Sequence, residues 1–135
     1  AAYALFYNNS ATGATYAAGE NIAYQSTLYN TATADIVNNN GLITLSGGTT
    51  GKAYLVNYQV TGETANDATL ALAINGTVDS NSEIIPNSAT GTSNGSYIVN
   101  VPANSTSTVA LRVVSGTVTT ASPTVGSYFS VIRIA

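Results

Sequence analysis

The sequence predicts an all-β protein, either a sandwich or a barrel, and three observations support this fold class. Apolar and polar residues alternate in many short segments, which is the period of a strand and not of a helix. These segments recur at intervals of roughly eight to twelve residues, as they do in antiparallel sandwiches and barrels. Glu, Lys, Arg and Leu, which favour helices, are too sparse to sustain one.

Each predicted strand is a run of β-branched, aromatic or aliphatic residues between turn residues. In chain order they are Tyr3–Tyr7, Ile22–Tyr29, Ala34–Val37, Leu42–Ser46, Lys52–Thr61, Ala68–Asn75, Ser96–Val101, Thr108–Ser115 and Ser127–Ile134. Asn-Gly pairs at 40–41, 75–76 and 94–95 supply positive φ for turns at little steric cost. Pro102 cannot continue a central strand and marks a further connection. No repeat or linker divides the chain, so we expect one domain over residues 1–135.

The composition excludes several classes of function. With three Lys plus Arg, six Asp plus Glu and a net charge of −3, the chain lacks the basic patch that nucleic acid or anionic lipid requires. There is no Cys or His, so neither thiolate nor imidazole is available as a metal ligand. No apolar run approaches the roughly 20 residues of a membrane-spanning helix. We therefore expect no nucleic-acid partner, no membrane partner and no cofactor.

Three predicted strands carry a second face that resembles neither solvent-exposed surface nor core. Their alternation assigns these residues to the core: Tyr54, Val56, Tyr58, Val60, Val109, Leu111, Val113, Phe129 and Val131. The opposite positions hold Leu55, Asn57, Gln59, Ala110, Arg112, Val114, Tyr128, Ser130, Ile132 and Ile134. We assign the three strands to one sheet. Its outward face, nearly uncharged and partly apolar, is typical of contacts between identical subunits.

Several ordered segments resemble TNF/C1q-like domains. GLITLSGGTTGKAYLVNYQV resembles the family's short strand that leads through a Gly turn into a Tyr-rich strand, and LALAINGTV resembles its fourth strand with an Asn-Gly turn. SYIVNVPANSTSTVALRVVSG is similar to the next hairpin, and SYFSVIRIA to the closing strand. The resemblance covers most of the chain.

Within that superfamily, the chain resembles the C-terminal heads of bacterial collagen-like spore-surface glycoproteins of the BclA type. Those heads are similarly poor in charge, Cys and Trp, and their first strand is similar to YALFYNNS. The chain itself contains no Gly-X-Y repeat. We therefore expect a collagen-like stalk upstream of Ala1 and a location in the exosporium, the outermost layer of the spore.

The resemblance implies a jelly roll of about ten antiparallel strands that forms a homotrimer. It places the first and last strands side by side in the inner sheet, facing the threefold axis. The residues predicted to form the trimer contact are Leu55, Asn57, Gln59, Arg112, Tyr128, Ser130, Ile132 and Ile134. Arg133 shares the core-facing positions, so we expect it at the rim of the sheet with its guanidinium in solvent.

Candidate sites for catalysis or metal binding are weak. A Ser nucleophile needs a base, and with no His the candidate is Lys52, which we interpret as a solvated cation. The six carboxylates lie apart or in predicted loops, so we expect no enzyme. Asp79, Asn81 and Glu83 alternate oxygen ligands in a way that could hold calcium. The segment lacks the Gly and the spacing of an EF-hand loop, and a polar surface loop is the better interpretation.

Two hypotheses of function remain. The first is a structural and interaction protein, the trimeric head of a collagen-like filament, which drives trimerisation and displays the filament tip to a host or the environment. The second is a carbohydrate- or receptor-binding trimeric tip of a phage fibre or a bacterial adhesin, since nine Tyr offer aromatic surface for sugars. The partners expected are two further copies of the chain and a host surface protein or glycan.

Overall fold

The computed structural model describes residues 2–9, 14–86, 91–120 and 126–135, and nearly all of its regular elements are strands. The strands are β1 (Tyr3–Tyr7), β2 (Thr15–Ala17), β3 (Ser26–Asn30), β4 (Ile36–Asn39), β5 (Leu42–Ser46), β6 (Lys52–Ile74), β7 (Thr77–Val78), β8 (Gly91–Val101), β9 (Thr106–Thr120) and β10 (Tyr128–Arg133). One turn of 3-10 helix, η1, spans Ser80–Ser82. The described residues contain no helix that is long and apolar enough to cross a membrane.

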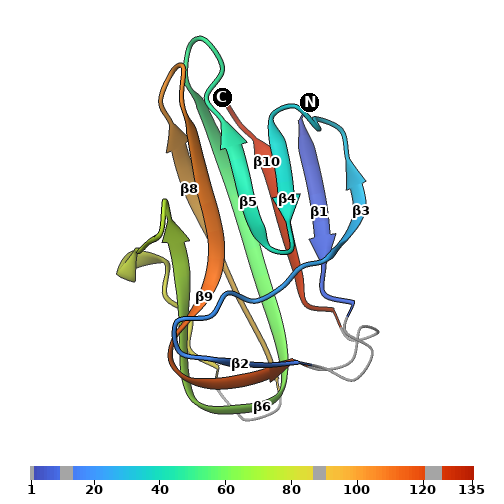
Figure 1. Cartoon of the computed structure of the whole chain (residues 1–135), viewed down its shortest axis with the longest axis vertical. Helices are drawn as coiled ribbons and strands as arrows, with labels where there is room; N and C mark the ends of the chain where they lie inside the picture. The colour runs from blue at the N-terminus through green and yellow to red at the C-terminus, as the bar shows by residue number, and fades with distance from the viewer. Residues whose placement is uncertain (1, 10–13, 87–90, 121–125) are drawn as a thin grey trace.

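The strands form two layers that the long strand β6 connects. Figure 1 shows β6 running to the lower end of the molecule, turning there and returning. Its first arm pairs with β10 and β8, and its second arm pairs with β9 and β7. The first sheet therefore has the order β3-β1-β10-β6-β8, and the second has the order β7-β6-β9-β5-β4. All of these pairs are antiparallel, and two such packed sheets make a jelly-roll sandwich.

The resemblance correctly places the first and last strands together. β1 pairs with β10 from Tyr3–Ile132 to Tyr7–Tyr128, and β10 pairs on its other side with the first arm of β6. β10 is thus a central strand whose backbone groups are paired at both edges. The two ends of the described chain lie at the same end of the molecule (Figure 1), where the Arg133 N–H donates to the Ala2 carbonyl.

The strand predictions hold in position but not always in length. Tyr3–Tyr7 and Leu42–Ser46 coincide with β1 and β5. Lys52–Thr61 and Ala68–Asn75 are the two arms of β6 and not separate strands. Of Ile22–Tyr29, only the end lies in β3. The start of this segment contacts the other sheet, where the Ile22 N–H donates to the Leu111 carbonyl of β9. β2 and β7 were not predicted, since three and two residues are too short for a detectable alternation.

Two of the three Asn-Gly turns are confirmed. Asn40 and Asn75 have φ of 51° and 52°, and each is followed by a Gly with positive φ. The turn predicted at Asn94-Gly95 is wrong, because both residues lie inside β8 opposite the first arm of β6. Gly95 instead makes room for an aromatic ring: a Cβ at this position would lie 2.6 Å from the Tyr58 ring.

The core lies between the sheets and contains the residues that alternation assigned to it. All nine of the predicted core residues are at most 2% exposed. The tyrosine hydroxyl groups inside the core reach backbone carbonyls: Tyr54 donates to Ser46 at 2.6 Å and Tyr58 donates to Ser82 at 2.7 Å. Burial, the main cause, raises the pKa of Tyr58 to about 12 and also raises the pKa of Tyr54. The phenols are therefore held neutral.

Asp35 ties the two sheets together at the rim. Its Oδ2 lies 2.9 Å from Lys52 Nζ and 3.6 Å from Arg133 Nη1. Arg133 lies at the rim as predicted, but its guanidinium forms an ion pair and is not simply solvated. Lys52 likewise pairs with a carboxylate. Two of the chain's three cations are thus used in one intrachain cluster.

A candidate interaction surface on the first sheet

The outward face of the first sheet carries a line of apolar side chains that cross it from strand to strand. Tyr3 pairs with Ile132, Ile132 with Leu55, and Leu55 with Ile98, so one residue comes from each of β1, β10, β6 and β8. We call these four residues the apolar row. Tyr3 and Ile132 are each 41% exposed and Ile98 is 54% exposed. Directly paired strand residues lie within about 5 Å of one another, so the row forms one continuous apolar patch.

Further apolar groups extend the patch at this end of the sheet. Tyr29 packs edge-to-face on Tyr3, with ring centroids 5.5 Å apart, and is itself 43% exposed. Ile134, just past β10, is 50% exposed. Next to the row is an open cavity of about 340 Å³, whose lining includes Ala53 and Pro102. The patch therefore combines protruding side chains with a hollow that can receive one.

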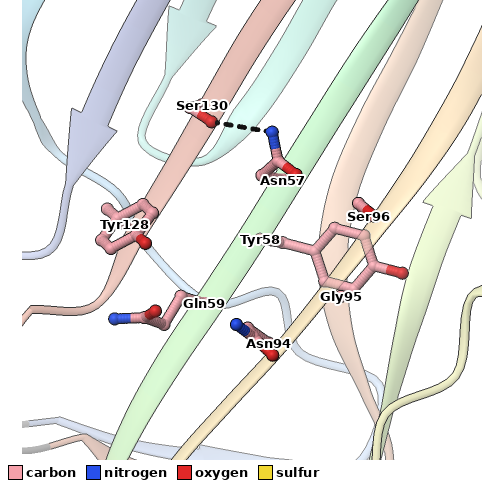
Figure 2. Close-up of a pocket in the computed structure, with 8 residues that line it drawn as sticks. All are labelled: Asn57, Tyr58, Gln59, Asn94, Gly95, Ser96, Tyr128 and Ser130. Atoms are coloured by element: carbon pink, nitrogen blue, oxygen red, sulfur yellow. Dashed lines mark hydrogen bonds between the residues drawn. The ribbon is translucent and has the colours of Figure 1, made fainter.

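The other end of the same face is polar. The next two registers across β10, β6 and β8 are Ser130–Asn57–Ser96 and Tyr128–Gln59–Asn94. These six side chains surround a cavity of about 290 Å³, and the strand segment at Tyr58 and Gly95 lies between them (Figure 2). We call it the polar cavity.

The apolar row and the polar cavity are both uncharged. Neither the apolar row nor the lining of the polar cavity contains Asp, Glu, Lys or Arg. Lys52, which lines the cavity of about 340 Å³ beside the row, forms an ion pair with Asp35, as does Arg133. A partner docking here would not have to desolvate an ion, which is the largest penalty in burying a protein surface.

The structure brings together most of the residues predicted for the trimer contact. Leu55, Asn57, Gln59, Tyr128, Ser130 and Ile132 share the outward face in register, and Ile134 follows Ile132 at its end. The prediction did not include Tyr3 and Ile98. Alternation in YALFY and SYIVNV could have identified both, since each lies between core-facing neighbours.

Arg112 does not share this face, although we predicted that it would. It lies in β9 and pairs with Ala71 of the second arm of β6, so it belongs to the second sheet. Its Nε donates to Asn21 Oδ1 at 3.0 Å, and its Nη1 donates to the Gly76 carbonyl at 3.2 Å. The error arose because β9 pairs with the returning arm of β6 and not with the first. We therefore leave Arg112 out of the candidate contact.

The weak calcium candidate uses its carboxylate within the chain. Asp79 caps η1: its Oδ1 accepts from the Asn81 N–H at 3.0 Å, and its Oδ2 accepts from the Tyr97 hydroxyl at 2.7 Å. The Tyr97 hydrogen bond, the largest cause, lowers the pKa of Asp79. No cluster of three or more Asp, Glu, His or Cys side chains that could hold a metal occurs among the described residues. The Asp79 arrangement is that of a structural cap.

Comparison with known proteins gives a fold and not a close relative. No protein-family model and no curated protein matches the sequence. Among solved structures, Eiger TNF from S. frugiperda matches with a TM-score of 0.72 at 13% identity, covering 98% of this chain and 92% of that chain. Murine APRIL matches with a TM-score of 0.72 at 9% identity and 98% coverage of both chains. The globular domain of zebrafish complement 1qA matches with a TM-score of 0.65 at 11% identity, covering 100% of this chain and 98% of that chain.

These likenesses establish the fold class that the sequence predicted. The chain is an all-β jelly roll of the TNF/C1q-like type. At such low identity the likeness carries the fold alone. What the domain does has to be argued from its own surface.

Proposed function

We propose that the chain is a non-enzymatic structural and interaction domain that assembles into a homotrimer through the outward face of the first sheet. The observation that carries this proposal is the apolar row, in which Tyr3, Ile132 and Ile98 are exposed side by side on a face without charge. A row of large apolar side chains exposed in register is what a subunit contact covers.

The energetics favour such a contact. Covering the remaining exposed surface of each large apolar side chain contributes on the order of 1 kcal/mol, and several such side chains on each subunit add together. No ionic group lies in the apolar row itself. The resemblance to TNF/C1q-like domains supports three copies, which close a ring by heterologous contacts, over the two copies of an isologous dimer.

The direct test is the mass of the intact chain in solution. Light scattering coupled to size exclusion should give three times the chain mass of 13.7 kDa at micromolar concentration. A stable species at the mass of one chain would overturn the trimer. A species at twice that mass would retain the contact but reject threefold closure.

We further propose that this trimer is the C-terminal head of a collagen-like surface filament in the spore exosporium. The resemblance to collagen-like spore glycoproteins supports this role, as does a surface with very few charges. A trimeric head would align three chains, which a collagen triple helix needs before it can wind. The test is the coding sequence upstream of Ala1: Gly-X-Y repeats support the proposal, whereas coiled-coil heptads or a β-helical stalk contradict it. Immunogold labelling of intact spores tests the location.

The second candidate function is a carbohydrate- or receptor-binding tip, also trimeric, of a phage fibre or an adhesin. The polar cavity favours it, because an uncharged cavity with several hydrogen-bonding groups is a feature of small-molecule sites. A glycan array probed with the intact chain separates the two candidates, since a filament head without a ligand gives no reproducible signal.

A further inference from the structure

The polar cavity differs from the apolar row in position as well as in chemistry. Asn57 and Gln59 follow Leu55 by two and four residues on the first arm of β6, which is roughly 7 to 13 Å along a strand. The cavity therefore lies beside the row on the same face. Its lining includes Asn57, Gln59, Tyr128 and Ser130, which were also predicted for the trimer contact, so a ligand can enter only where that contact covers the row and leaves the cavity open.

The cavity floor is preformed by close packing on the inner side. Gly95 and Tyr58 are paired residues, and the Tyr58 ring occupies the space that a Gly95 side chain would take. The Tyr58 hydroxyl group is held by Ser82. Because this layer cannot shift without displacing a core ring, the lining side chains above it stand on a rigid base.

Part of the hydrogen-bonding capacity of the lining is open. Gln59 Nε2 donates to the Gly126 carbonyl at 2.7 Å, and Asn57 Nδ2 donates to Ser130 Oγ at 3.4 Å, which leaves both amide oxygens free of these two bonds. The side chains of Asn94, Ser96 and Tyr128 form no hydrogen bond with the rest of the described chain. Amide and hydroxyl groups both donate and accept, so the cavity presents donors and acceptors at several points.

We propose that the polar cavity is a subsite for one ring of a neutral carbohydrate. Sugar hydroxyls are both donors and acceptors and match the amides and hydroxyls of Asn57, Gln59, Asn94 and Ser96. The Tyr128 ring at the edge of the cavity, seen in Figure 2, supplies an apolar surface for the C–H face of the sugar. A charged ligand is disfavoured, because no charged side chain lines the cavity to offset the cost of removing an ion from water. This inference rests on the second candidate function.

The cavity size agrees with a single ring. Its volume of about 290 Å³ lies just below the range for sites of drug-sized ligands, roughly 300–1,000 Å³. A longer glycan would extend along the face away from the apolar row. Binding of one ring through a few neutral hydrogen bonds predicts a weak site, with a Kd on the order of 1 mM.

The test is calorimetric titration of the intact chain with glucose, galactose, mannose, rhamnose and N-acetylglucosamine, with N-acetylneuraminic acid as a charged comparison. At least one neutral sugar should bind. Asn94→Ala and Tyr128→Ala should each weaken binding about tenfold or more, the effect of losing about 1.4 kcal/mol, while Tyr128→Phe keeps most of it. Asn39→Ala is the matched control, because Asn39 is an exposed amide on the second sheet.

The outcomes separate this proposal from the proposals that precede it. Failure of all neutral sugars to bind, or binding that Asn94→Ala and Tyr128→Ala leave unchanged, would overturn the cavity proposal. A positive glycan array with unchanged binding in both variants would keep the binding-tip function but place its site elsewhere. Light scattering on each variant shows whether assembly is intact. A monomer that binds a sugar through Asn94 and Tyr128 would keep the subsite and reject the trimer.

Discussion

The outward faces of the two sheets differ in how far their apolar side chains are exposed. On the first sheet, Tyr3, Ile132 and Ile98 stand exposed in one register. On the second sheet, Ala71 and Ala73 occupy outward positions but are at most 2% exposed. The outward apolar residues of the second sheet are buried within the chain, and those of the first sheet are the ones that we propose a partner covers.

Arg112 is a polar residue on the outward face of the second sheet. It shares the outward face with the small alanines of the second sheet, and hydrogen bonds to Asn21 and Gly76 hold its guanidinium. The exposed large apolar side chains in the strands of this sheet are Val37, Leu42, Val78 and Val114. Val37 pairs with Thr44, Leu42 with Asn39 and Val78 with Ala73, so these side chains do not pair with one another in a row. A scattered apolar residue is normal on any surface, whereas a row in register indicates an interface.

The largest expected effect comes from placing a charge in the apolar row. Ile132→Asp should dissociate the proposed trimer, because an unpaired carboxylate buried at a contact costs about 3 kcal/mol or more. Light scattering at micromolar concentration measures the loss. Leu42→Asp is the control, since Leu42 is 40% exposed, like Ile132 at 41%, but lies on the second sheet. A trimer that survives Ile132→Asp would show that the outward face of the first sheet is not the subunit contact.

The next effect is a loss of stability at high pH, and it tests whether the stability of the core depends on assembly. Burial raises the pKa of Tyr24 and Tyr54, and it raises the pKa of Tyr58 to about 12. The folded state keeps these protons when the unfolded chain, with a pKa near 10, has lost them. Stability should therefore be complete below pH 10 and fall between pH 10 and 12, by up to about 1.4 kcal/mol per pH unit for each tyrosine.

Urea unfolding between pH 8 and 11.5 measures this slope. Because all three tyrosines are buried within one chain, the Ile132→Asp variant should lose stability with the same pH slope as the wild type. A steeper slope in the wild type would mean that tyrosines of the interface also titrate.

A smaller effect is expected on the second sheet. Arg112→Ala removes two hydrogen bonds from a charged donor and should lower the free energy of unfolding by about 1.5–3 kcal/mol. The trimer mass should not change, because Arg112 lies outside the proposed contact. Urea unfolding and light scattering on the same sample give both values. Dissociation at unchanged stability would return Arg112 to the interface.

The smallest effect concerns the cap at Asp79. Its pKa is lowered, mainly by the Tyr97 hydrogen bond, so the folded state binds the proton less readily than the unfolded chain does. The stabilisation is present above the ordinary carboxylate pKa near 4 and is lost as the pH falls through the folded value. Thermal unfolding between pH 6 and 2.5 should show a slightly steeper acid loss in the wild type than in Asp79→Asn. Equal slopes would show that the cap contributes nothing.

Prediction from sequence succeeded where a local pattern decides the outcome. Alternation in KAYLVNYQV assigned Tyr54 and Tyr58 to the core and Leu55 and Asn57 to the opposite face, because successive side chains of a strand must point to opposite sides. The same rule correctly divided the residues of β10. The Asn-Gly signal for a turn failed at Asn94-Gly95, where both residues continue a strand and Gly95 leaves space for the Tyr58 ring.

The sequence by itself determined the all-β class, the core residues and the semi-polar second face, because side-chain alternation is a property of each strand alone. Which faces lie in one sheet was decided only by the tertiary structure. β6 turns and returns, so Arg112 meets its second arm on one sheet while Ile132 and Ile98 meet its first arm on the other. Strand pairing joins residues far apart in the chain, and the sequence of a single strand does not indicate which strand it pairs with. The apolar row exists only because four strands meet in register, and the polar cavity because three of them do.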